Sequence, residues 1–537
     1  MTATMSPAVL KQHLRSDSDE IALLDVRERG TYGKGHALFA ACLPLGRLEL
    51  DIDRMVPRRG AMVVLVDEGG DDDRAARAGA LLEGFGYSAV SVLEGGMEGW
   101  RAAGEEVFDG VYVPSKAFGE FVEAECDTPR ITADDLFDLK RQDTDMVILD
   151  SRPFNEYRRM NIPGGINVPG AELVHRVHDL APNPETLVVV NCAGRTRSII
   201  GAQSLINAGV ENRVVALENG TMGWTLAGHD LEHGKERVPP APTREARAWA
   251  HEAATRVRER YNVPTIDRDE LARFQEHSDA QTLYLCDVRT REEYEASHLP
   301  GSRHTPGGQL VQSTDSYVPV HNARIVVIDD DGVRATMTAS WLLQMGRRNV
   351  SVLSGGLDTA PLETGPQPNQ VLGLSPARTA FEIAVMRLVG MLPGRDMTLL
   401  DLTDSQHFKR GHIEGAWWAA RARLADAVAH LPEAEMLVLT SRDSLVAHLA
   451  APEIGRHVRC PVKVLAGGTD AWIAAGFPLK EGDQQMIGEQ DDVHLLPYDY
   501  PEPEIESAMH AYLEWETALV PRVERDGVAQ FDVAPRA

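Results

Sequence analysis

The chain contains one segment that combines a nucleophile with positive charge, Cys192-Ala193-Gly194-Arg195-Thr196-Arg197-Ser198. An apolar run, LVVVN, precedes it, and a segment of helical periodicity, SIIGAQSLINAGV, begins at its last residue. A cysteine attacks as its thiolate, and a helix N-terminus and neighbouring arginines both favour that anionic form. The small residues Ala193 and Gly194 allow backbone N–H groups to turn inward around an anion. The segment predicts Cys192 as a catalytic nucleophile and residues 193–198 as the substrate-binding loop.

A buried core cysteine is the alternative interpretation of Cys192, because cysteine is among the most buried residue types. A role in the hydrophobic core would not explain why arginines flank Cys192 or why the residue directly follows a strand. We expect the other four cysteines to be structural, with Cys126 as the candidate for a second thiol; they are Cys42, Cys126, Cys286 and Cys460. They form no CxxC or Cys/His cluster, so we expect no metal site and no cofactor.

The elements that position this loop recur four times along the chain. A short apolar strand ends in Asp25, Asp150, Asp287 and Asp401. A second strand follows, and the residue at its end is Asp67, Cys192, Asp329 and Ser441, which lie 42, 42, 42 and 40 residues after the first aspartate. A third strand and turn follow as VSVLEGG, VVALENG, VSVLSGG and VKVLAGG. Three landmarks at such steady spacing predict four copies of one structural unit.

The strands are continuous runs of Val, Ile and Leu, which is typical of parallel strands buried on both faces. Helical segments alternate with them, and one ends at Gly209, a C-cap residue. The pattern predicts α/β units, each a mainly parallel sheet flanked by helices, with ligands at the carboxyl ends of the strands. We predict five segments: residues 1–105, 106–235, 244–365 and 371–482 as the four units, and 483–537 as an acidic linker with a C-terminal helical tail. A helix over 506–520 is expected to serve packing or dimerisation.

The repeat resembles the rhodanese-like sulfurtransferase family. The resemblance rests on a strand ending in Asp-x-Arg, a tyrosine followed by a GHIPGA-like turn, the cysteine loop, and a final GG-x-x-x-W-x-x-AG segment, seen here as GGMEGWRAAG, NGTMGWTLAG and GGTDAWIAAG. It covers most of residues 1–482 and implies four tandem rhodanese-like domains. It further implies that Cys192 carries a sulfane sulfur as a persulfide from a donor to a thiophilic acceptor. Asp150 and Arg152 match the family's strand-end pair, and we interpret them as structural.

The resemblance leaves several functional alternatives open. Related cysteine phosphatases use Cys-x5-Arg, but the sixth residue after Cys192 is Ser198, which disfavours a phosphatase or an arsenate reductase. CAGRTR matches neither the CG[ST]GVT-like loop of mercaptopyruvate-using relatives nor the CRKGVT-like loop of two-domain thiosulfate enzymes. Its arginines favour thiosulfate as the donor, followed by a small persulfide, with cyanide or a thiol as acceptor. A persulfide carrier or a binding scaffold is the non-enzymatic alternative.

The other three copies have lost the nucleophile. Copy one reads Asp67-Glu68-Gly69-Gly70-Asp71-Asp72-Asp73, copy three Asp329-Asp330-Asp331-Gly332, and copy four Ser441-Arg442-Asp443-Ser444. Carboxylates at a helix N-terminus are stabilising, but they repel an anionic donor. We therefore expect copies one, three and four to be inactive scaffold or docking surfaces.

Composition sets the remaining expectations. The 537 residues carry a net charge of −27, which argues against a broad nucleic-acid footprint. Neither a signal-peptide pattern nor an apolar stretch of about 20 residues is present, so we expect a cytoplasmic protein with no membrane association. Expected partners are a small anionic sulfur donor, a thiol or cyanide acceptor, and a second copy of the chain or a sulfur-acceptor protein.

Overall fold

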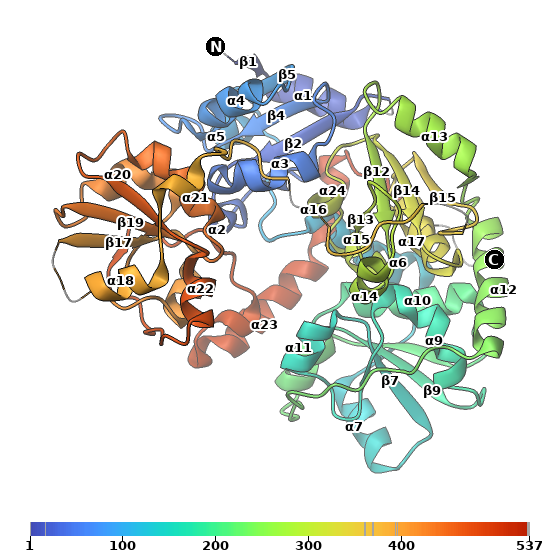
Figure 1. Cartoon of the computed structure of the whole chain (residues 1–537). Helices are drawn as coiled ribbons and strands as arrows, with labels where there is room; N and C mark the ends of the chain where they lie inside the picture. Colours follow the sequence, from blue (N-terminus) through green and yellow to red (C-terminus); the bar gives the residue numbers. More distant parts are fainter. Residues whose placement is uncertain are drawn as a thin grey trace.

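The computed structural model describes residues 2–533 apart from positions 17, 359–360, 368–369, 393 and 395. Within them the chain forms four sheets in which all paired strands are parallel, each flanked by helices (Figure 1). This confirms the α/β architecture with four repeated units and a helical C-terminal tail. The last four residues of the predicted 483–537 segment lie outside the described residues.

The four sheets share one strand order. The first is β1 (Ala3–Met5), β5 (Ala89–Leu93), β4 (Met62–Val66), β2 (Ile21–Asp25) and β3 (Ala41–Cys42). The second is β6 (Arg130–Ile131), β10 (Val214–Leu217), β9 (Leu187–Asn191), β7 (Met146–Asp150) and β8 (Ile166–Asn167). The third is β11 (Thr265–Ile266), β15 (Val350–Leu353), β14 (Arg324–Ile328), β12 (Leu283–Asp287) and β13 (Arg303–His304). The fourth is β16 (Glu382–Ile383), β20 (Val462–Leu465), β19 (Met436–Thr440), β17 (Met397–Asp401), β18 (Trp417–Ala419) and β21 (Met486–Ile487).

The central strands are buried as their apolar runs predict. All five residues of β9 are buried, because helices cover both faces of its sheet. The second strand of every unit ends one residue before its landmark position, at Val66, Asn191, Ile328 and Thr440. The four strand-end residues, Cys192 among them, therefore occupy equivalent places at the carboxyl edge of their sheets.

The strand-end aspartates form buried ion pairs in three units. Arg152 donates from Nη2 to Asp150 at 2.7 Å and to the Met160 carbonyl at 2.6 Å, and both ionic side chains are at most 2 % exposed. Arg27 with Asp25 and Arg289 with Asp287 repeat this arrangement. The pair links the end of the first strand to the turn that follows it, and this geometry is consistent with the structural role predicted for Asp150 and Arg152.

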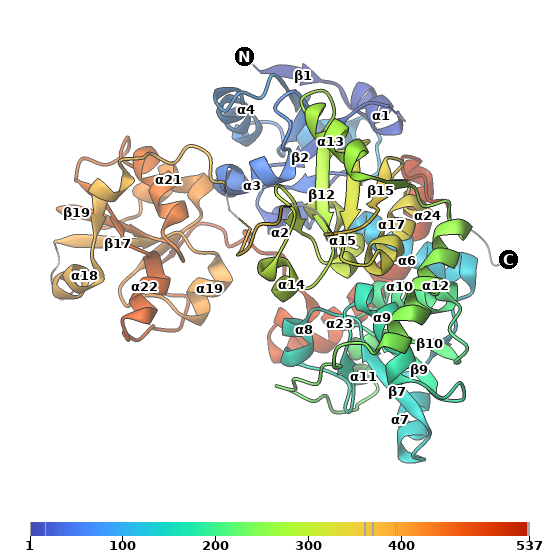
Figure 2. The same cartoon turned by 45° about the vertical axis from the view of Figure 1, so that its right-hand side comes forward.

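The units pack through apolar faces. The first and third share one core, in which Leu24 and Leu65 lie in the same cluster as Tyr284 and Val327. The helix α12 (Arg244–Arg260) joins a cluster with residues of the second and third units, so it bridges them (Figure 2). The fourth unit contacts the first both through Ala422, which joins the shared core, and through an ion pair of 2.7 Å between Arg421 and the buried Glu49.

The C-terminal segment runs from the fourth unit to the second unit, where it reaches the region of Cys192. β21 first extends the fourth sheet beside β18. Two helices follow, α23 (Glu502–Thr517) and α24 (Leu519–Asp526), where the sequence predicted one helix over 506–520. The helix α23 leaves the fourth unit and packs against α6 (Val113–Cys126) and α11 (Gly220–Leu226). Among the described residues, no helix has both the length and the apolar character of a membrane span.

Candidate active site

Cys192 lies between the end of β9 and the start of α10 (Thr196–Ala208), at the carboxyl edge of the second sheet. Its side chain is enclosed, since the residue is only 2 % exposed. The hydroxyl of Ser198, in the first turn of α10, donates a hydrogen bond to Cys192 Sγ at 3.0 Å. Gly209 ends α10 at a φ of 79°, as its predicted C-cap role requires.

The backbone of the loop is arranged to receive an anion. The carbonyl oxygens of Cys192 and Ala193 point outward and accept hydrogen bonds from Thr221 N at 2.9 Å and Met222 N at 3.0 Å. The N–H groups of residues 193–197 have no hydrogen-bond partner among the described residues. Successive free N–H groups at a helix N-terminus form an anion-binding nest. The nest and the thiol therefore share one loop.

Arg195 forms ion pairs with neighbouring carboxylates. Its guanidinium donates to Glu120 at 2.7 and 2.8 Å and also pairs with Glu123, and both glutamates lie on α6. Only 6 % of Arg195 is exposed. The arginine thus anchors the loop to α6, and its charge is balanced by the two glutamates.

Arg197 is balanced in the same way on the other side of the loop. It donates two hydrogen bonds of 2.8 Å to Glu156 and one of 3.2 Å to Gln309 of the third unit. Although burial opposes the shift, the charge of Arg197 holds the pKa of Glu156 below its ordinary range. The sequence indicated the positive charges of Arg195 and Arg197 but not their carboxylate partners. Because those charges are balanced, the backbone N–H groups are the part of the loop that remains available to bind an anion.

Three residues that sequence reasoning missed also enclose the loop. Glu516, on α23, is fully buried and accepts a hydrogen bond of 2.6 Å from the Thr196 hydroxyl. Lys116, on α6, lies 3.2 Å from the same carboxylate and donates to the Tyr512 hydroxyl. Although burial opposes it, the charge of Glu516 raises the pKa of Lys116 above its ordinary range. The C-terminal helix, expected only to pack or dimerise, therefore forms part of this site.

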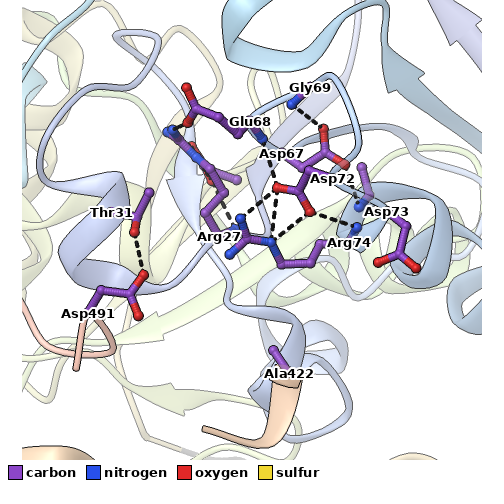
Figure 3. A network of polar contacts seen from close by, with 12 residues as sticks. Arg27, Thr31, Asp67, Glu68, Gly69, Asp72, Asp73, Arg74, Ala422 and Asp491 are labelled. Atoms are coloured by element: carbon purple, nitrogen blue, oxygen red, sulfur yellow. Dashed lines mark hydrogen bonds and ion pairs between the residues drawn. The ribbon is translucent and has the colours of Figure 1, made fainter. Parts of the chain in front are cut away.

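In the first unit, the carboxylate of Asp67 stands at the strand-end position and accepts a hydrogen bond from the loop backbone (Figure 3). Asp67 accepts hydrogen bonds from the N–H groups of Gly69 at 3.1 Å and Ala75 at 3.0 Å. Glu68 pairs with Arg27 and Arg101 beside it. The loop's own side chains therefore occupy the backbone N–H groups of Gly69 and Ala75.

The third unit is closed in a similar way. Asp329 accepts from Gly332 N at 2.6 Å and Ala335 N at 3.0 Å, and burial followed by the charge of Asp331 raises its pKa to about 6. Asp329, Asp330 and Asp331 bring three carboxylates together. Asp330 lies 2.6 Å from Arg334 and Asp331 2.8 Å from His175, so existing partners already engage these oxygens.

The fourth unit keeps an open loop. Ser441 occupies the nucleophile position and accepts a hydrogen bond of 3.3 Å from Ala447 N. The N–H groups of residues 442–444 have no hydrogen-bond partner in the described part of the chain. A cavity of about 320 Å³ adjoins Ser441, between the first and fourth units. This unit lacks the thiol but keeps N–H groups without partners among the described residues, although Ser444 adopts a left-handed φ of 69° where Arg195 of the second unit has a φ of −117°.

Comparison with known proteins agrees with the repeated fold and the loop. The rhodanese-like domain family matches residues 6–103, 132–227 and 267–359. The crystal structure of a thiosulfate sulfurtransferase from Pseudomonas aeruginosa is 47 % identical, with a TM-score of 0.94 and 99 % of each chain covered. A shorter similarity exists to an HTH-type transcriptional regulator of Mycobacterium tuberculosis, which is 30 % identical over 18 % of this chain and 41 % of that protein. Another exists to the centrosomal protein of 41 kDa of Xenopus tropicalis, which is 30 % identical over 14 % of this chain and 22 % of that protein. The chain thus spans less than half the length of these two curated relatives. From the family match and the repeated architecture, the chain belongs to the rhodanese-like domain family.

Proposed function

We propose that this protein is a thiosulfate sulfurtransferase that carries sulfur as a persulfide on Cys192. The observation that carries the proposal is the Cys192 loop, where an enclosed thiol adjoins five backbone N–H groups without partners in the described chain. Rhodanese-type sulfurtransferase activity is further supported by 47 % identity over 99 % of the chain to a thiosulfate sulfurtransferase.

In the first half-reaction, the Cys192 thiolate attacks the outer sulfur of thiosulfate. A bond forms between Sγ and that sulfur, the S–S bond of the donor breaks, and sulfite leaves with the electron pair. The N–H groups of residues 193–197 stabilise the donor's negative charge and that of the persulfide. Arg195 and Arg197 hold the loop in shape through Glu120 and Glu156, and Ser198 donates to the sulfur.

The second half-reaction passes the outer sulfur to a thiophilic acceptor, either a small molecule or a thiol on a partner protein. A carrier role is supported by the three units whose strand ends hold no cysteine. We also place the protein in the cytoplasm, because its five cysteines are few and widely scattered, which disfavours a disulfide framework.

Mass spectrometry after mixing with thiosulfate tests the proposal. We expect the Cys192 peptide of the wild-type protein to gain one sulfur atom, and cyanide to remove it with formation of thiocyanate. Cys192→Ala should abolish both, whereas Cys126→Ala serves as the matched control and should keep both. A Cys192→Ala protein with full thiosulfate:cyanide activity would contradict the assignment. Loading without turnover by small acceptors would favour the carrier role.

A further inference from the structure

Glu516 has a carboxylate oxygen without a partner inside the Cys192 site. Its Oε1 is held by Thr196 at 2.6 Å and by Lys116 at 3.2 Å. Its Oε2 is buried and has no hydrogen-bond partner in the described part of the chain. A Cβ atom built on Gly194, two residues after the nucleophile, would lie 3.2 Å from Oε2. One oxygen is thus fixed in place and the other faces the catalytic loop.

A free acceptor oxygen in this place needs an occupant that can donate a hydrogen bond. Leaving a buried acceptor unsatisfied costs about 1–3 kcal/mol, and more when the group is charged. Thiosulfate arrives as an anion with no proton to donate, and the negative charge of Glu516 repels it. A thiol carries the proton that this oxygen lacks, and that proton must be lost before the sulfur can attack.

We propose that Glu516 is the general base of the second half-reaction and that the acceptor is a thiol. The inference rests on the proposed function, since it requires a persulfide on Cys192. In this step the S–H proton of the acceptor passes to Glu516 Oε2, and a bond forms between the acceptor sulfur and the outer persulfide sulfur. The bond from that outer sulfur to Cys192 Sγ breaks, and its electron pair stays on Cys192, which regenerates the thiolate.

The remaining contacts explain how the base is positioned. Lys116 and Thr196 restrain Oε1, so the carboxylate cannot rotate away from the loop without losing both hydrogen-bonding partners. Tyr512, one turn earlier on α23, also approaches Gly194, with its Cε1 3.2 Å from the same Cβ position. Because Gly194 has no side chain, α23 can approach closely enough to place the Glu516 carboxylate next to the loop.

The test is a single-turnover measurement on the full-length protein. The protein is first loaded with thiosulfate, freed of excess donor, and checked for the persulfide by mass spectrometry. Loss of the persulfide is then timed at mildly alkaline pH after mixing with glutathione or with sulfite, which is a dianion without a proton under these conditions and takes the outer sulfur to form thiosulfate. We expect Glu516→Gln to slow transfer to glutathione by about 100-fold, the scale of general base catalysis. Transfer to sulfite should be unchanged or faster, because the variant removes a negative charge.

Glu514→Gln is the matched control, because Glu514 lies on the exposed side of the same helix, and it should leave both rates unchanged. Equal slowing of both acceptors by Glu516→Gln would overturn the proposal and assign the residue a packing role. If that variant does not fold, the test is made on the wild-type protein by comparing its sulfur-transfer rates in D2O with those in H2O. Slower transfer to glutathione but not to sulfite supports proton transfer, and equal effects contradict it. Failure of the wild-type protein to form any persulfide refutes the proposed function itself.

Discussion

The Ser198 hydroxyl donates to the Cys192 sulfur across 3.0 Å, and both residues are at most 2 % exposed. The corresponding residues of the other units are alanines whose backbone N–H donates to the strand-end side chain instead. The side-chain hydrogen bond is therefore specific to the unit with the thiol. It supplies a donor to the sulfur at the moment when the sulfur carries negative charge.

Ser198→Ala should lower the rate of Cys192 alkylation by iodoacetamide at neutral pH by about tenfold, and the rate of sulfur loading by a similar factor. A hydrogen bond to a charged group contributes about 1.5–3 kcal/mol, and 1.4 kcal/mol corresponds to a factor of ten. Ser507→Ala, on the exposed side of α23, is the control. Unchanged alkylation in Ser198→Ala would show that the hydroxyl does not stabilise the thiolate.

Gly220→Ala should abolish sulfur loading. Gly220 has a φ of 54°, and a Cβ atom there would lie 2.3 Å from the Cys192 carbonyl oxygen. The loop must shift to relieve this contact, and misplacement by about 1 Å costs about 100-fold in rate. Gly468→Ala is the matched control, since its Cβ would lie 2.0 Å from the Ser441 carbonyl oxygen in the fourth unit. Loading, followed by mass spectrometry, should survive the second change; equal loss in both would point to general misfolding.

Ser441→Cys should create a second sulfur-binding position. The loop around Ser441 has N–H groups at residues 442–444 without partners among the described residues, and it adjoins a cavity of about 320 Å³. A thiol there therefore meets backbone donors, although it lacks the hydroxyl donor that Ser198 gives Cys192. In a Cys192→Ala background, thiosulfate should add one sulfur atom to the residue-441 peptide. The same change at Asp67 should give no loading, because carboxylates and arginines fill that loop. Loading at residue 67 but not at 441 would show that loop geometry does not govern the reaction.

Asp401→Asn should stabilise the fourth unit at neutral pH. Thr403 stands where the other units have the arginine partner, and burial raises the pKa of Asp401 to about 6. Between about pH 4 and about pH 6 the unfolded chain releases this proton while the folded unit retains it, so stability falls as the pH rises. The full penalty, about 2–3 kcal/mol, is present above about pH 6.

Thermal midpoints at about pH 4 and about pH 8 measure this effect. The midpoint of Asp401→Asn should exceed that of the wild type at the higher pH and approach it at the lower pH. Asp150→Asn provides the contrast, because it leaves the buried Arg152 without its partner and should cost about 3–5 kcal/mol. Destabilisation by Asp401→Asn at about pH 8 would contradict the conclusion that burial of an unpaired carboxylate raises the pKa of Asp401.

The four sheets and the place of Cys192 were predictable from sequence for one physical reason. Buried parallel strands require apolar runs, and the strand-end residues then recur at fixed distances, so the pattern is local and repeated. The partners of the loop are not local. Glu120 lies 75 residues before Arg195, and Glu516 lies 320 residues after Thr196. No periodicity connects such positions, so their contacts emerge only from the fold.

The same distance sets an order of events during synthesis. Chains grow at about 5–20 residues per second, and domains near the N-terminus fold first. The 320 residues between Thr196 and Glu516 therefore take roughly 15 s to 1 min to be made. Throughout that interval the second unit can fold while its thiol lacks the cover of α23. The loop therefore gains its hydrogen bond between Thr196 and Glu516 only when the chain is nearly complete.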